Sequence, residues 1–163
     1  MLTGFQYRAG LAITRTDLNE LSNILGIHSA TLIRYKKTPN LEFICARSKN
    51  VGLIISFFNS KGVLFKDKNI VLLDRKKDLK GLTRFHLVVG RIATGLNQSQ
   101  LSSILKVSHG TISLLENKNN TDLINTKKIN NTYLTDFFKR IGVILGNDYS
   151  VTLTKDPHLF FNR

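Results

Sequence analysis

The chain has 163 residues, of which 42% are hydrophobic and 21% are charged, a composition that fits one folded domain or two small ones. Its 24 Lys and Arg residues against 11 Asp and Glu residues give a formal net charge of +13, a surplus that attracts polyanions such as nucleic acid. One cysteine excludes an internal disulfide, and the longest apolar run, 51–58, is too short to span a bilayer. We therefore expect a cytoplasmic chain without a membrane partner, whose basic surface serves either solubility or a polyanion.

The first predicted elements are two short helices joined by a tight turn. Asp17 and Glu20 stand in the N-cap and N3 positions of a capping box, and apolar residues follow them at helical spacing. The sequence GIH at 26–28 is the predicted turn. His28 is a poor helix cap, so we expect Ser29 to cap the second helix instead.

The second of these helices has an inward and an outward face. Leu32 and Tyr35 fall on the inward face, where core packing is their best interpretation. The outward face and the basic end of the helix consist of Ser29, Ala30, Ile33, Arg34, Lys36 and Lys37. Arg34 fits a solvated charge or a contact to guanine, and Ile33 fits a scattered exposed apolar residue or a contact to a thymine methyl group.

The next segment, NVGLIISFFNSKG at 50–62, is rich in β-branched residues and could be a strand or a helix. It ends at Gly62, which is suited to a helix C-terminus. Two short apolar stretches separated by the polar turn KDKN follow it and predict a β-hairpin.

The sequence contains an internal repeat, and its second copy decides between strand and helix for 50–62. A shift of 80 residues aligns 83 pairs without a gap, of which 20 are identical, where chance would give roughly six. The partner of 50–62 carries Tyr133, Leu134, Phe137, Phe138 and Ile141 on one helical face, so both copies are predicted to be helices. The stretches VIL and SVTL predict the second hairpin.

The predicted fold is therefore mostly α with short β-hairpins, in two tandem helix-turn-helix units of four to five helices plus a hairpin, related by a pseudo-twofold. The predicted boundaries are 1–74 for the first repeat, 75–81 for a linker and 82–163 for the second repeat. The apolar LIISFF segment and the face of Leu134, Phe137 and Phe138 are the expected contacts between the halves.

In the second half, Asn97 and Gln100 form the capping box, KVS at 106–108 is the turn, and Ile112 and Leu115 point inward. The outward face of the second helix is small and polar at its start, and consists of His109, Gly110, Ser113, Leu114 and Asn117. Such a start lets a helix end enter a DNA groove, although local packing would explain Gly110 equally well.

The segment GLNQSQLSSILKVSHGTISLLEN resembles the helix-turn-helix of the phage-repressor family (the Cro and xenobiotic-response-element type) in spacing and residue type over roughly 85–119. The resemblance implies that Gln98 and Ser108 bind phosphates, and that His109, Gly110, Ser113 and Leu114 face base edges. In the first copy, which matches more weakly, Ser29, Ala30, Ile33 and Arg34 would face the bases, and the cations around Arg34 would lie near phosphates. That copy has Leu18 at the position of Gln98, and leucine cannot bond a phosphate.

The resemblance implies a sequence-specific regulator of transcription, a repressor in bacteria or phage, that binds double-stranded DNA as a single-chain pseudo-dimer at the nucleoid. A protein-binding module, such as an antitoxin or an antagonist of another regulator, is the alternative, with homodimerisation or another protein as partner. Both halves are basic, with formal charges of +8 for 1–80 and +5 for 81–163, as phosphate binding requires. The basic runs at 74–77 and 127–128 are weaker candidates for phosphate binding. No motif for catalysis, a metal or another cofactor is present, so we expect no enzyme.

Overall fold

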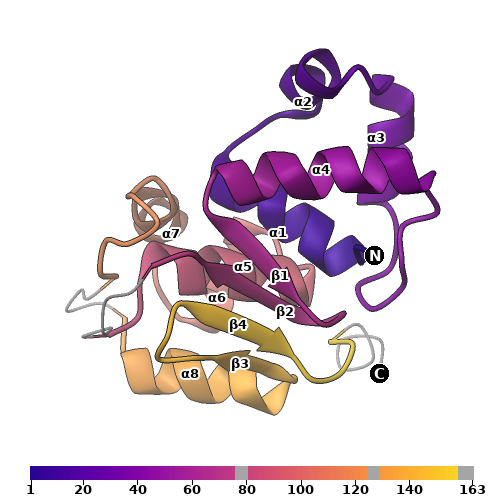
Figure 1. Cartoon of the computed structure of the whole chain (residues 1–163). Coiled ribbons are helices and arrows are strands. Elements are labelled where there is room, and N and C mark those ends of the chain that lie inside the picture. The colour runs from indigo at the N-terminus through magenta and orange to yellow at the C-terminus, as the bar shows by residue number, and fades with distance from the viewer. Residues whose placement is uncertain (76–80, 125–128, 158–163) are drawn as a thin grey trace. The chain divides into compact units, whose positions relative to one another are not determined.

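The computed structural model describes residues 1–75, 81–124 and 129–157. Contacts divide the chain into two units, Met1–Asp74 (unit 1) and Arg75–Arg163 (unit 2). Most of the predicted linker and the basic pair at 127–128 lie outside the described residues. Within the described ranges the fold is mainly helical with short antiparallel hairpins (Figure 1). No helix in these ranges is long and apolar enough to cross a membrane.

Unit 1 has four helices followed by a hairpin. The elements are α1 (Gly4–Thr14), α2 (Leu18–Leu25), α3 (Ser29–Lys36), α4 (Ser48–Ser60), β1 (Val63–Lys66) and β2 (Ile70–Leu73). The two strands pair antiparallel, with Val63 opposite Leu73. The helix predicted for 50–62 is present and ends at Ser60, and the predicted hairpin is confirmed.

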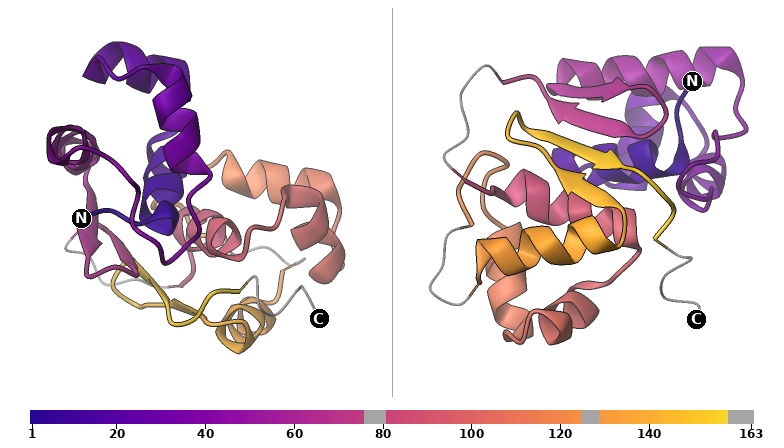
Figure 2. Two further views of the ribbon diagram at one scale, coloured as in Figure 1. Left: turned by 90° about the vertical axis from the view of Figure 1, so that its right-hand side faces the viewer. Right: turned by 90° about the horizontal axis from the view of Figure 1, so that it is seen from below.

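Unit 2 repeats this order of elements within its described residues. The elements are α5 (Arg84–Thr94), α6 (Gln98–Ile104), α7 (His109–Glu116), α8 (Asn131–Arg140), β3 (Val143–Leu145) and β4 (Ser150–Leu153). β3 and β4 pair antiparallel, with Val143 opposite Leu153. Figure 2 shows α8 lying beside this hairpin, as α4 lies beside the first one.

The first helix of each unit starts at a threonine that also contacts the loop after the second motif helix. Thr3 pairs with Phe43 and Thr83 with Leu123 in isolated antiparallel bridges. The Thr3 N–H donates to the Gln6 side chain at 3.1 Å, which satisfies a donor that the helix start leaves free. Both contacts fix the entry of the first helix against the rest of its unit.

Each core contains a phenylalanine of the fourth helix packed against a glycine of the first. A Cβ atom on Gly10 would lie 2.7 Å from the ring of Phe58, and one on Gly90 would lie 2.9 Å from the ring of Phe138. Both rings are fully buried. The expectation that these segments serve as contacts between the halves is wrong for Phe58 and Phe138, because their rings fill the cores of their own units.

The predicted apolar face of α8 is also narrower than expected. Leu134, Phe138 and Ile141 are fully buried, whereas Tyr133 is 50% exposed. The Tyr133 hydroxyl donates to the Ile104 carbonyl at 3.4 Å, at the end of α6. An aromatic residue with a polar tip can cover the rim of a core, and spacing alone does not separate this position from a buried one.

Candidate nucleic-acid interface

The first helix of each two-helix motif begins at a polar cap. In unit 2, the Asn97 side chain accepts from the Gln100 N–H at 2.8 Å and the Gln100 side chain accepts from the Asn97 N–H at 2.9 Å, which confirms the predicted capping box. In unit 1, the Asp17 carboxylate accepts from the N–H groups of Asn19 and Glu20, both at 2.8 Å. These caps satisfy donors that the helix start leaves free, so α2 and α6 begin where the sequence predicts.

The turn in each motif contains one residue in the left-handed region. Gly26 has a φ of +64° and Lys106, at the equivalent position, has a φ of +53°. Glycine adopts this conformation without a Cβ clash, whereas other residues lose about 1 kcal/mol or more there. Both turns therefore have a left-handed residue at the equivalent position, but only unit 1 has the residue suited to it.

The second motif helices are capped by different chemistry. The Ser108 hydroxyl accepts from the Thr111 N–H at 3.2 Å, as predicted. The expectation that Ser29 replaces His28 as cap is wrong, because His28 Nδ1 accepts from the Ala30 N–H at 3.3 Å. Nδ1 is as many bonds from Cβ as the side-chain oxygen of asparagine, so an unprotonated imidazole can act as the same kind of acceptor.

The two faces of each second helix separate as predicted. The relative exposure is 0% for Leu32, 2% for Tyr35, 0% for Ile112 and 2% for Leu115. The predicted interface residues that are exposed are Ala30, Ile33, Arg34, Lys36, Lys37, Ser108, His109, Gly110, Leu114 and Asn117. Those that are half-buried are Ser29, Gln98 and Ser113. None of the predicted interface residues lies in a core.

In unit 2, Gln98 belongs to a network that links three helices. Its amide nitrogen donates to Glu116 at 2.8 Å. Arg91 of α5 donates to both oxygens of the same carboxylate, at 2.5 and 2.7 Å. Glu116 is only 7% exposed, so this two-point ion pair is shielded from solvent. The network fixes α6 and α7 on α5, and sequence patterns did not indicate Arg91 or Glu116 because the partners are far apart in the chain.

Unit 1 has a different set of residues at these three positions. Shifted by 80 residues, the network falls on Leu11, Leu18 and Lys36. Leu11 is 8% exposed and Leu18 is half-buried, whereas Lys36 is exposed. Two leucines therefore occupy the places of Arg91 and Gln98, and the residue at the end of α3 presents a cation to solvent in place of a neutralised carboxylate.

An arginine from the first helix holds the carboxyl end of the second motif helix in each unit. Arg8 donates to the Lys36 carbonyl at 2.9 Å and to the Asn40 side chain. Arg84 donates to the Glu116 carbonyl at 2.6 Å and to the side chain of the equivalent asparagine. Arg84 aligns with position 4, which is one helical turn before Arg8. The two arginines therefore reach equivalent carbonyl groups from different positions of the first helix. These two cations have a structural role in positioning the interface.

A cleft of about 550 Å³ lies beside α3 in unit 1. It is lined by Thr31, Arg34, Tyr35, Cys45, Ala46, Arg47 and Asn50. The Arg34 guanidinium lies over the Tyr35 ring, 5.9 Å from its centre. This cation–π contact favours a position of the Arg34 side chain at the wall of the cleft. Arg47, which directly precedes α4, lines the same cleft, so the cleft carries two cations. Arg47 was not among the predicted interface residues.

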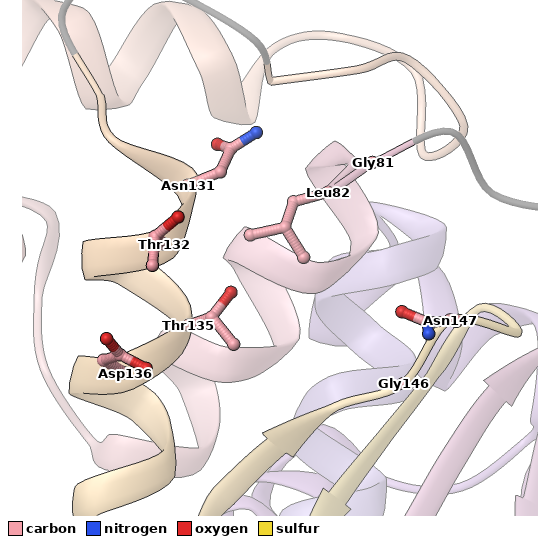
Figure 3. Close-up of a pocket in the computed structure, with 8 residues that line it drawn as sticks. All are labelled: Gly81, Leu82, Asn131, Thr132, Thr135, Asp136, Gly146 and Asn147. Carbon is pink, nitrogen blue, oxygen red and sulfur yellow. The ribbon is translucent and has the colours of Figure 1, made fainter.

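A second hollow, of about 340 Å³, lies in unit 2 between the start of α5, α8 and the β3–β4 turn. Figure 3 shows Thr135 and Leu82 facing one another across it and Asn147 on the hairpin. Asp136 is the one carboxylate among its lining residues. At the equivalent place in unit 1, an apolar hollow of about 460 Å³ includes Met1 and Phe43. Neither hollow contains a predicted interface residue.

No protein-family model, no curated protein and no solved structure matches the chain significantly.

Proposed function

We propose that the chain is a sequence-specific double-stranded DNA-binding regulator of transcription, a repressor, built as a tandem duplication of a helix-turn-helix unit. One observation carries the proposal. In α3 and in α7, one face packs on the core of its unit while the residues predicted to meet DNA lie exposed or half-buried on the other. The formal charge of +13 favours a polyanion as the partner of these faces.

The two motifs act together as a single-chain pseudo-dimer. Helix-turn-helix proteins read two half-sites about one helical turn, roughly 34 Å, apart, because one motif contacts too few bases to be selective. Here the repeated order of helices and strands supplies both motifs on one chain. Because α3 and α7 differ at nearly every outward position, the preferred site is an imperfect palindrome.

Individual residues have distinct roles in this proposal. Arg34 contacts a guanine and Ile33 a thymine methyl group in one half-site, while Ser113 and Leu114 face bases in the other. An amide nitrogen carries two hydrogens, so the bond from Gln98 to Glu116 leaves one hydrogen for a phosphate. The ion pair beneath Gln98 would then orient this phosphate contact.

The first test is selection of bound sequences from random duplexes at physiological salt. The proposal expects a bipartite, imperfectly palindromic motif. Enrichment of a single half-site would remove the pseudo-dimer but leave DNA binding in place. A failure to enrich any sequence would favour the protein-binding module, for which the 72% exposure of Leu114 on a helix without Lys or Arg is the supporting observation.

The second test addresses Arg34. Replacing Arg34 with Ala should reduce discrimination at one base pair of one half-site by about 1–3 kcal/mol, because a two-point contact to guanine is lost. Competition binding with single-base variants of the selected site measures this. Lys66→Ala, an exposed cation on β1, is the control and should not change the preference at any base. Equal loss in both half-sites, or equal loss on random DNA, would contradict the assignment.

A further inference from the structure

The second helices of the two motifs differ in charge. α3 and the residue after it contain Arg34, Lys36 and Lys37 and no acidic residue. α7 and the residue after it contain no Lys or Arg and one acidic residue, Glu116. In addition, Arg91 neutralises Glu116, so the outward face of α7 is close to neutral. α3 and α7, each taken with the residue after it, therefore differ by four formal charges.

The cleft in unit 1 adds to this difference. Arg34 and Arg47 line the same hollow, and the exposed side chains of Lys36 and Lys37 follow on the end of α3. Four cations on α3 and the loop after it make a surface suited to consecutive backbone phosphates, because guanidinium groups bind phosphate oxygens at two points.

The cations closest in sequence to α7 have other surroundings. Lys106 lies in the turn before the helix, and Lys118 after it donates to the Leu123 carbonyl at 2.9 Å. The residue equivalent to Arg47 is Lys127, which lies outside the described residues. Leu114 stands where unit 1 has Arg34, and is 72% exposed.

From this we infer that the two units divide the work of DNA binding, which rests on the function proposed above. Unit 1 supplies most of the phosphate contacts, through Lys36, Lys37 and Arg47, and hence the salt-dependent affinity. Unit 2 reads its half-site mainly through neutral and apolar contacts from α7. The phosphates belong to the DNA backbone, which docks in the cleft beside α3.

The test compares matched sets of charge removals in the full chain. One variant carries Lys36→Gln, Lys37→Gln and Arg47→Gln, and the other carries Lys106→Gln, Lys118→Gln and Lys127→Gln. Affinity for the selected site and for a random duplex is measured over a range of salt concentrations. Each phosphate contact contributes about 0.9 to the slope of log affinity against log salt. The slope for the unit 1 variant should fall by about 2–3, and by the same amount on both duplexes. The slope for the unit 2 variant should fall by at most about one.

Each outcome is decisive. Equal loss of slope in the two variants would overturn the division of work while leaving DNA binding intact. A wild-type chain that binds no duplex would overturn the proposed function, and the division with it. Circular dichroism of both variants establishes that they are folded before their slopes are compared.

The only cysteine of the chain gives a second, independent readout. Cys45 is exposed and lines the cleft, so a bound DNA backbone should shield its thiol from a maleimide dye. We expect slower labelling with random duplex DNA at low salt, and wild-type rates for the unit 1 variant under the same conditions. Protection by inorganic phosphate at the same phosphate concentration would overturn the assignment to the DNA backbone. Unchanged labelling in the presence of bound DNA would also overturn it.

Discussion

Gln6 and His86 occupy equivalent positions in the repeat and make equivalent contacts with different chemistry. Gln6 donates to the carbonyls of Asp67 and Ile70 in the first hairpin, at 3.0 and 3.2 Å. His86 accepts from the Thr83 N–H at 3.2 Å through Nδ1, and its Nε2 donates to the carbonyl of Gly146 at 2.9 Å. This network requires a neutral ring with its proton on Nε2. Each side chain therefore ties the start of its first helix to its hairpin, but only the histidine can be protonated.

Burial lowers the pKa of His86 from 6.5 to about 4, against weaker opposing effects of the bond to Gly146 and the charge of Asp148. The stacked ring of Tyr149 covers the imidazole on another side. Because the unfolded chain binds this proton more readily, the contribution of His86 to stability is full above about pH 6.5 and is lost as the pH falls towards 4.

We predict that His86→Gln, which places the residue of unit 1 in unit 2, makes stability less dependent on pH. Between pH 7 and pH 4.5, the wild-type chain should lose about 2–3 kcal/mol more unfolding free energy than the variant. Urea titrations at the two pH values measure this difference, and the carboxylates that titrate in both chains cancel in it. Parallel losses in the two chains would show that His86 is protonated without cost in the folded state.

At the scale of elements, a phenylalanine of the fourth helix packs directly on a glycine of the first helix in each unit. Phe58 lies edge-on to Tyr7 at 6.3 Å and to Phe65 at 5.8 Å between ring centres, so its ring is confined while it covers Gly10. The glycine allows the backbone of α1 to approach this ring. Its value lies in the space it leaves, because in an ordinary helix glycine is less stable than alanine by about 1 kcal/mol.

Gly10→Ala should accordingly lower the unfolding free energy by about 1–3 kcal/mol, despite the better helix propensity of alanine. Gly52→Ala is the matched control: it lies in α4, is exposed, and its Cβ would meet nothing within 4 Å, so it should stabilise by a few tenths to 1 kcal/mol. Both values come from denaturant unfolding. Adding Phe58→Leu to Gly10→Ala should recover part of the loss, and a strictly additive double variant would argue against the clash.

The sequence was sufficient for elements whose signals are local. The caps at Asn97 and Ser108, the inward face of α7 and both hairpins follow from residues a few positions apart, and the structure agrees with them. The ion pair of Arg91 with Glu116 joins residues 25 positions apart, so no helical or strand period contains it. The cap at His28 was missed for another reason, because cap preferences are averages and this imidazole makes the bond that the averages assign to other residues.

At the scale of the whole molecule, the chain divides into two units, and the second begins directly after Asp74. When two binding modules share a chain, the first contact makes the second an intramolecular event with a high effective concentration. In the proposed function, this would replace the association of two subunits on which symmetric helix-turn-helix dimers depend. Binding of the proposed regulator should therefore not depend on dimerisation.

Insertion of ten Gly and Ser residues after Asp74 should weaken binding to the bipartite site by about threefold to fivefold, since effective concentration falls roughly as the −3/2 power of tether length. Affinity for a duplex with only one half-site should stay at the wild-type value. Fluorescence anisotropy with the two duplexes measures both quantities. Unchanged affinity for the bipartite site would mean that something other than the tether sets the spacing of the motifs.

The different residues beneath the two motifs limit how the proposed regulator could be retargeted. An engineer who exchanged only α3 for α7 would bring the Glu116 carboxylate against Leu11 and Leu18, and a shielded carboxylate without a cation costs several kcal/mol. The graft would have to include the residues at 91 and 98 as well. New specificity must therefore be moved between the halves as a set of three helices, and the same coupling would have made the two copies diverge by concerted rather than single replacements.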